Sequence, residues 1–385
     1  MEKHKAAVIT PGSFFIPSGW NSSVERVVEQ MIPLVPEGFD IRIYGVQEPG
    51  QAVVGSIGGN LPVYRLPGGK SYAAGVIRSL REWKPRVIDV QNRPLLAWRI
   101  KHAMPDARVV ATLHSLTYIS PPHVSRESAE HLLEPIDEIV ANSVYLKHVI
   151  GTRYPGVRDK ISVNPLGVRL QDFVPRWTPQ SEALRDAKLR DKGWQGRRIV
   201  LYAGRLQPIK GVHHILEALP ELIRTVPEVM VVIVGSPFYG TGRRTSYETH
   251  LHHLAGASAN HVTFVPFVSY QAISYWYHLA DVVVVPSGEG EAFGLVNVEA
   301  MASAVPVVAS DSGGIPEIIE DGVSGLLVTQ SSLPHGLVPA LIRLLTDESM
   351  RRSFGQAGLM RAAQSYQWRH SAARWHELMQ KLSSQ

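Results

Sequence analysis

The sequence predicts an α/β protein built from two doubly wound domains. Short β-branched runs alternate with helical stretches along most of the chain, as expected when parallel strands are joined by helices. At 385 residues the chain is long for a single core, so two domains of ordinary size are expected. Its 44% hydrophobic and 19% charged residues are typical of a globular protein and not of a disordered one.

Composition narrows the classes of function. A formal net charge of +5 permits attraction to a nucleotide, an acidic glycan or a membrane surface without choosing among them. The basic residues are scattered, which argues against nucleic-acid binding. Without cysteine the chain forms no disulfide, which fits the cytoplasm. No stretch reaches the roughly 18 apolar residues of a membrane span. The expected location is therefore cytoplasmic, with a peripheral membrane association left open.

The first domain is expected to begin with a strand, a polar loop and a helix. Residues 6–10 form an apolar run typical of a buried strand, and residues 24–31 show helical periodicity. The loop between them holds Gly19, Trp20 and Asn21 but no Gly-x-Gly-x-x-Gly motif, which counts against an NAD-dependent oxidoreductase. Further strands are expected at residues 41–44, 87–90 and 109–113.

Polar side chains follow several of these strands. Asn92 and Arg93 come directly after residues 87–90, and His114 ends the strand that precedes Tyr118. Asn142 follows another short apolar run. Ligands of doubly wound sheets bind beyond the carboxyl ends of the strands, so these positions are candidates for ligand contact. A lone histidine is more often structural, and that alternative stays open for His114.

The second domain places basic residues after a strand. Residues 198–203 form an apolar strand that ends at Gly204, where glycine allows a sharp turn. Arg205 and Lys210 flank the loop that follows, ahead of a helix. The next strand ends at Gly235 in a second loop at the same edge of the predicted sheet.

A strand, a loop and a helix also make up residues 281–301. The β-branched run at 281–286 is broken by a polar loop, and a helix is expected from Phe293. The first amides of that helix have no intrahelical partner, which favours an anion at its N-terminus. Glu291 lies in the loop and Glu299 about two helical turns further on, so the two carboxylates are expected to face opposite ends of one extended ligand.

The residues from Glu291 to Val328 resemble the signature of retaining family-4 glycosyltransferases. The resemblance lies in the Glu-x7-Glu spacing of Glu291 and Glu299 and in the ordered runs at residues 306–317 and 320–328. Segments before residue 175 resemble the family more weakly and are similar to its bacterial spore-coat members, which leaves a spore-coat location open as well.

This resemblance implies the GT-B fold, in which two Rossmann-like domains face each other across a cleft and the last helix crosses back to the first domain. The implied domains are residues 1–172 together with 366–385 on the acceptor side, and residues 173–365 on the side of the nucleotide sugar.

The resemblance also implies roles for the charged residues. Departure of a nucleoside diphosphate leaves negative charge on a phosphate, and the sequence contains no Asp-x-Asp motif to hold a metal there. Arg205 and Lys210 are expected to stabilise that charge in place of a metal. Glu291 is expected to hold the transferred sugar, His114 to contact a sugar hydroxyl, and Glu299 to accept hydrogen bonds from the ribose.

Further residues are assigned by the same likeness. Arg169 stands where the family has an acid, which favours an anionic acceptor, with a surface salt bridge as the alternative. Trp20 would stack on a sugar ring, with packing within its loop as the alternative. The predicted donor-binding residues are Gly204, Gly235, Phe267, Phe293, Gly294, Leu295 and Glu299, and the predicted acceptor-side residues are Gly19, Trp20, Asn21, Asn92, Arg93, Tyr118, Asn142 and Arg169.

The predicted function is transfer of a sugar, with retention and without a metal, from a nucleoside diphosphate to a hydroxyl of a carbohydrate or lipid-linked acceptor. No cofactor is expected beyond the co-substrate, for which a UDP-sugar is favoured. Two alternatives stay open: a sugar-nucleotide-binding coat protein with little turnover, and a nucleotide-sugar epimerase. The histidine pairs at 213–214 and 252–253 are not expected to bind metal, because neighbouring side chains on a helix point about 100° apart.

Overall fold

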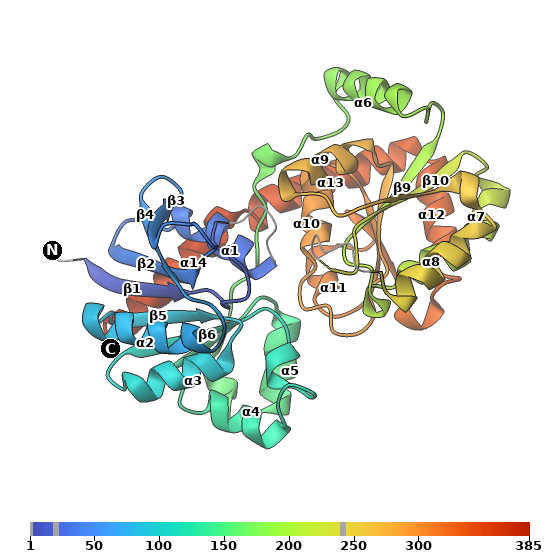
Figure 1. Cartoon of the computed structure of the whole chain (residues 1–385). Coiled ribbons are helices and arrows are strands. Elements are labelled where there is room, and N and C mark those ends of the chain that lie inside the picture. Colours follow the sequence, from blue (N-terminus) through green and yellow to red (C-terminus); the bar gives the residue numbers. More distant parts are fainter. Residues whose placement is uncertain (1–2, 18–22, 239–243) are drawn as a thin grey trace. The chain divides into compact units, whose positions relative to one another are not determined.

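The computed structural model describes residues 3–17, 23–238 and 244–385. These residues fall into two compact units, one of Met1–Gly167 with Trp368–Gln385 and one of Val168–Gln367 (Figure 1). The sequence placed these boundaries at residues 172 and 366. The segment after Gly167 belongs to the second unit because the Val168 amide donates to the Tyr366 carbonyl (2.7 Å) and the Phe173 ring packs against Tyr277.

Unit 1 is built on an eight-stranded sheet with the order β3-β4-β2-β1-β5-β6-β7-β8. Its strand pairs are parallel except for β3 and β4, which are antiparallel. All residues of β5 are buried, as expected of a parallel strand covered on both faces. The strands are β1 (His4–Ile9), β2 (Phe39–Val46), β3 (Val54–Ile57), β4 (Leu61–Leu66), β5 (Val87–Gln91), β6 (Arg108–Leu113), β7 (Glu138–Ala141) and β8 (Ile161–Val163).

Helices cover this sheet, and the last helix of the chain is one of them. Helix α2 packs beside α3, whereas α1 packs beside α14, which also contacts β5. The predicted return of the C-terminal helix to the first domain is therefore confirmed. The helices are α1 (Ser23–Met31), α2 (Tyr72–Trp83), α3 (Pro94–Ala103), α4 (Arg126–Leu133), α5 (Val144–Arg153) and α14 (Trp368–Ser383).

Unit 2 holds a six-stranded parallel sheet with the order β11-β10-β9-β12-β13-β14. Strand β11 ends at Val265, because Pro266 has no amide to donate to the ladder. The strands are β9 (Arg198–Ala203), β10 (Val229–Val234), β11 (Val262–Val265), β12 (Val282–Val285), β13 (Val307–Ser310) and β14 (Gly325–Val328).

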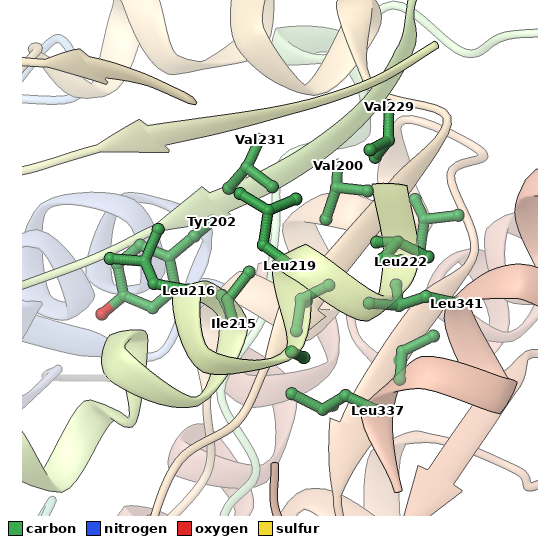
Figure 2. Packing of buried hydrophobic residues seen from close by; sticks show 14 of the residues in the cluster. Val200, Tyr202, Ile215, Leu216, Leu219, Leu222, Val229, Val231, Leu337 and Leu341 are labelled. Atoms are coloured by element: carbon green, nitrogen blue, oxygen red, sulfur yellow. The ribbon is translucent and has the colours of Figure 1, made fainter. Parts of the chain in front are cut away.

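The core of unit 2 joins its sheet to two helices. Figure 2 shows Ile215 and Leu219 of α7 among side chains of β9 and β10, with Leu337 and Leu341 of α12 beyond them. Burying one such side chain contributes about 1.5–3 kcal/mol, so β9 and α7 are firmly held and fix both ends of the loop between them. The helices are α6 (Pro179–Asp191), α7 (Val212–Thr225), α8 (Ser246–Gly256), α9 (Tyr270–Leu279), α10 (Leu295–Ala302), α11 (Ile315–Ile318), α12 (Leu337–Thr346) and α13 (Glu348–Ser365).

The two doubly wound α/β sheets confirm the predicted fold class. Across the described ranges, no helix is both long enough and apolar enough to cross a membrane.

Candidate functional site

In unit 2, the loops after β9 and β10 touch each other. Gly235 has a φ of +151°, and a Cβ there would lie 1.8 Å from the carbonyl oxygen of Gly204, so only glycine fits. The Leu206 amide donates to Ser236 across the same contact (3.1 Å). The buried Tyr202 hydroxyl donates to the Arg205 carbonyl (2.8 Å) and fixes the start of the loop.

The two predicted cations of this loop differ in their surroundings. Lys210 ends a short 3-10 turn (Pro208–Lys210), and its Nζ forms an ion pair with Oε2 of Glu291. The same oxygen accepts a hydrogen bond from the Ser287 hydroxyl (3.1 Å). Arg205 is exposed, and no ion pair to its guanidinium is recorded among the residues that the structure describes. The sequence separated Lys210 and Glu291 into two roles, whereas the folded chain joins them.

The backbone of Glu291 is fixed by the loop after β13. The Gly314 amide donates to the Glu291 carbonyl (2.9 Å). Gly313 has a φ of +61°, and a Cβ there would lie 2.0 Å from that carbonyl oxygen, so a larger residue would push the loop away. The glycine pair after β13 therefore positions a predicted catalytic carboxylate.

Helix α10 begins at Leu295, two residues later than the sequence predicted, because Gly294 has a φ of +88° and caps the helix. The Phe293 ring is buried and packs edge-on against Tyr366 (5.9 Å between ring centres). Phe293 is thus a core side chain, and only its backbone could meet a ligand. The Asn297 amide donates to the carbonyl of the capping Gly294 (3.0 Å), whereas helix geometry leaves the Leu295 and Val296 amides without intrahelical acceptors, and the helix dipole favours an anion beside them.

Glu299 lies deeper, on α10, with 7% of its surface exposed. Its Oε2 accepts a hydrogen bond from the buried Tyr277 hydroxyl (2.8 Å), a contact that the sequence did not reveal because Tyr277 reads as an apolar position of α9. The predicted ribose contact of Glu299 stays a prediction. Phe267 follows β11, whose last carbonyl, at Val265, accepts the Gly235 amide (3.0 Å).

In unit 1, the structure brings together three predicted residues at the ends of β5, β6 and β7. The His114 amide donates to Oδ1 of Asn92 (3.2 Å), and Nδ2 of Asn142 donates to the His114 carbonyl (3.3 Å). Asn92 has a φ of +52°, a left-handed conformation that asparagine tolerates better than most residues. These contacts hold the backbone of His114 in place.

The His114 side chain belongs to a chain of hydrogen bonds. Gln91 donates through Nε2 to Oδ2 of the buried Asp89 (2.8 Å), so its Oε1 is free to accept. That oxygen lies 2.9 Å from Nε2 of His114, which assigns the ring proton to Nε2. Burial lowers the pKa of His114 to about 4, so the ring is neutral near pH 7 and Nδ1 is a hydrogen-bond acceptor.

Other acceptor-side residues have partners of their own. The Arg93 guanidinium lies over the Tyr118 ring (3.9 Å) and donates to the Ser13 hydroxyl (2.6 Å). Burial raises the pKa of Glu25 to about 7 even though Arg93 lowers it, a perturbation that the sequence did not indicate. In unit 2, Arg169 lies 3.8 Å from Asp172 in an exposed ion pair, which favours the surface interpretation of this residue. The predicted residues Gly19, Trp20 and Asn21 lie outside the described residues.

A cavity of about 70 Å³ lies within unit 1, lined by residues that include Met31, His114, Asn164 and Trp375. Ligand pockets usually measure about 300–1,000 Å³, and this volume suits roughly two water molecules. The cavity is therefore a gap between the sheet and its covering helices and too small for a sugar.

Two family models match this chain, one over its first part and the other over its second. Residues 24–172 match the family model described as Glycosyltransferase Family 4, and residues 185–360 match the one described as Glycosyl transferases group 1. Spore coat protein SA of Bacillus subtilis is 29% identical over 96% of this chain and 97% of its own. A D-inositol 3-phosphate glycosyltransferase of Mycolicibacterium gilvum is 31% identical over 78% of this chain and 68% of its own.

Solved structures agree in fold. Sucrose-phosphate synthase of Thermosynechococcus elongatus superimposes with a TM-score of 0.78 at 22% identity, covering 99% of this chain and 100% of that one. The HepE protein of Anabaena, solved in complex with UDP-glucose, gives 0.76 at 20% identity over the same shares of the two chains. The two family models and the relative from Mycolicibacterium gilvum establish the family, and the solved structures agree with its fold: the chain belongs to the family-4 glycosyltransferases of the GT-B fold.

Proposed function

We propose that this glycosyltransferase transfers a sugar from a nucleoside diphosphate to an acceptor hydroxyl, with retention of the anomeric configuration and without a metal. The observation that carries the proposal is the grouping of Lys210 and Glu291 beside the start of α10, with Arg205 exposed on the same loop as Lys210. A UDP-sugar is the donor we favour, in keeping with the UDP-glucose complex of the HepE protein.

The reaction needs charge stabilisation at one position. The bond between the anomeric carbon and the phosphate oxygen breaks, and its electron pair stays on the departing diphosphate. Arg205, Lys210 and the first amides of α10 would stabilise that charge as it develops. The acceptor oxygen forms the new bond on the face that the leaving group vacates, and its proton passes to the departing phosphate oxygen. No separate general base is then required.

The ion pair between Lys210 and Glu291 would have to break when the nucleotide sugar binds. A diphosphate is a stronger partner for an ammonium group than one carboxylate. When Lys210 turns to the phosphates, the Glu291 carboxylate becomes available to accept hydrogen bonds from sugar hydroxyls. His114 would contact one further sugar hydroxyl; its Nδ1 is the ring nitrogen left without a partner among the described residues, but it is buried and would have to be uncovered first.

The acceptor is proposed by class only. We favour a hydroxyl of a carbohydrate or of a lipid-linked molecule at the cell envelope or spore surface. This choice agrees with the names of two relatives, Spore coat protein SA and D-inositol 3-phosphate glycosyltransferase. A cytoplasmic enzyme with peripheral attachment to that surface fits such an acceptor.

The decisive experiment supplies a panel of nucleotide sugars with and without candidate acceptors, in buffer containing a chelator. We expect acceptor-dependent release of nucleoside diphosphate, unchanged by the chelator, and a product with the anomeric configuration of the donor. Lys210→Ala should lower the transfer rate by a factor of about 10² because one such contact is worth on the order of 3 kcal/mol. Arg224→Ala, an exposed cation at the far end of α7, is the matched control and should leave the rate unchanged.

Three outcomes would count against the proposal. Full activity of Lys210→Ala would remove this side chain from the mechanism, and loss of activity in chelator would contradict transfer without a metal. An altered sugar formed without any acceptor would indicate the epimerase alternative.

A second candidate function is a coat component that binds sugar nucleotide with little turnover, favoured by the likeness to Spore coat protein SA over nearly the whole chain. Saturable binding of a UDP-sugar without product, across the full acceptor panel, would support it over catalysis.

A further inference from the structure

A group of metal-ligating side chains lies on α7, outside the site described above. Within the ranges that the structure describes, His213, His214 and Glu217 are the residues whose ligand atoms come together, all within 4.8 Å of one another. The two imidazole ring centres are 3.9 Å apart. The prediction that these neighbouring histidines point away from each other is therefore wrong, because their side chains bend toward one another.

The spacing along the helix explains why a third ligand joins them. Glu217 is four residues after His213 and three after His214, and residues three and four apart lie on one face of a helix. Its Oε2 already lies 3.3 Å from Nδ1 of His214. All three side chains are partly or fully exposed, so a cation could reach them from solvent.

Tyr247 of α8 orients the first of these ligands. Its hydroxyl lies 2.8 Å from Nδ1 of His213, which leaves Nε2 as the nitrogen for coordination. The same hydroxyl accepts the His213 backbone amide (3.3 Å), so the tyrosine is itself held in place. A partner on the second ring nitrogen is the usual arrangement of metal-bound histidines.

We propose that His213, His214 and Glu217 form a binding site for a divalent transition cation of the Zn²⁺ class. Two imidazoles and one carboxylate are the donor set of open zinc sites, in which water fills the fourth position. Mg²⁺ prefers oxygen ligands and is excluded by this donor set. Zinc bonds of about 2.0–2.1 Å hold tetrahedral ligands roughly 3.4 Å apart, so ligand atoms that now lie up to 4.8 Å apart approach one another by up to about 1.4 Å on binding.

This site is separate from the proposed transfer chemistry, which needs no metal. It lies on the helix that directly follows the Lys210 loop, but none of its three residues has a role in the donor site. Failure of one proposal therefore leaves the other standing.

The test is calorimetric titration of the full chain with ZnCl₂ and, in parallel, with MgCl₂. We expect one Zn²⁺ per chain and no Mg²⁺ binding. His214→Ala should weaken Zn²⁺ binding by at least about tenfold, and Tyr247→Phe, which removes only the orienting hydroxyl, by about tenfold. His253→Ala, an exposed histidine on α8, is the matched control and should bind as the unchanged protein does.

Titration with Co²⁺ gives a second readout, since visible absorption reports its coordination geometry. We expect the bands of four-coordinate Co²⁺ in the unchanged protein and their loss in His214→Ala. Equal Zn²⁺ binding by His214→Ala and the unchanged protein, or the absence of saturable binding to either, would overturn the proposal. Circular dichroism of each variant would establish that the fold is retained.

Discussion

Each unit holds a buried aspartate beside its central strands, and the two are stabilised in opposite ways. Asp89, in β5 of unit 1, accepts hydrogen bonds from neutral donors: Thr112 (2.6 Å), Trp375 (2.7 Å) and Gln91 (2.8 Å). Burial dominates there and raises the pKa of Asp89 to about 6.

Asp281, directly before β12 of unit 2, is surrounded by arginines. Its carboxylate lies 2.7 Å from Arg185, 3.4 Å from Arg176 and 3.8 Å from Arg351. Burial alone would raise the pKa of Asp281, but these cations and the Ile199 amide (2.8 Å) lower it instead. Glu182 and Glu348 pair with two of the arginines from the outside.

The comparison separates two uses of the same residue. Asp281 stays ionised and ties α6, α13 and the start of β12 into one charged cluster. Asp89 is a hydrogen-bond acceptor whose charge is costly, and through Gln91 it orients His114. Charge at Asp281 therefore supports the fold, whereas charge at Asp89 opposes it. This difference can be tested by removing each charge without changing shape.

The largest effect is expected for Asp281→Asn. The change leaves three buried guanidinium groups without their shared counter-charge, and breaking a buried ion pair in this way costs about 3–5 kcal/mol of unfolding free energy. Urea unfolding followed by circular dichroism would measure the loss. Asp186→Asn, an exposed position on α6, should change the unfolding free energy by less than about 0.5 kcal/mol. A loss below 1 kcal/mol for Asp281→Asn would show that the arginines do not depend on this carboxylate.

For Asp89 we expect the opposite effect: its negative charge lowers the unfolding free energy, and comparison with Asp89→Asn at different pH values should show this. The pKa of Asp89 rises from 3.8 to about 6 on folding, so the folded state binds this proton more tightly than the unfolded state. Stability from the protonated group is fully present below about pH 4 and is lost as pH rises through 6. The unchanged protein should therefore lose about 3 kcal/mol relative to Asp89→Asn across that window, at about 1.36 kcal/mol per pKa unit.

Urea unfolding of both proteins at closely spaced pH values from 4 to 7 would measure this difference. A difference that stays constant over the range would show that Asp89 does not titrate there. A gain in stability of the unchanged protein relative to Asp89→Asn as pH rises would place Asp89 in the same class as Asp281, whose charge is stabilising above about pH 4 and loses its effect as pH falls below its lowered pKa.

Local sequence predicted the strands that carry the site but not its long-range contacts. The β-branched runs at 87–90 and 109–113 correspond to β5 and β6, and the placing of His114 near Asn92 follows from parallel strand order. The edge strand β3 was missed because Gly55 and Ser56 interrupt its apolar pattern. Helix α10 starts late because the conformation of Gly294 is not visible in composition.

Contacts between distant residues could not be read from the sequence. Lys210 meets Glu291 across 81 positions, and Trp375 meets Asp89 across 286. No periodicity links such pairs, since each depends on how whole elements pack. For the same reason Asp281 appeared only as the start of an apolar strand, and no role was predicted for its three arginines, which lie before α6, on α6 and on α13.

The smallest effect on stability is expected for Lys210→Ala, although its effect on transfer should be large. The side chains of Lys210 and Glu291 are 25% and 14% exposed, unlike those of Arg351 and Asp281, which are each 1% exposed. Solvent-exposed ion pairs contribute at most about 1 kcal/mol to the unfolding free energy. When Lys210 is removed, the Glu291 carboxylate still accepts a hydrogen bond from the Ser287 hydroxyl. The unfolding free energy of Lys210→Ala, measured by urea unfolding on the same preparation as the transfer assay, should therefore lie within about 1 kcal/mol of that of the unchanged chain. A loss of several kcal/mol would make Lys210 part of the structural charge network, and any fall in its transfer rate would then follow from a damaged fold and not from lost phosphate contact.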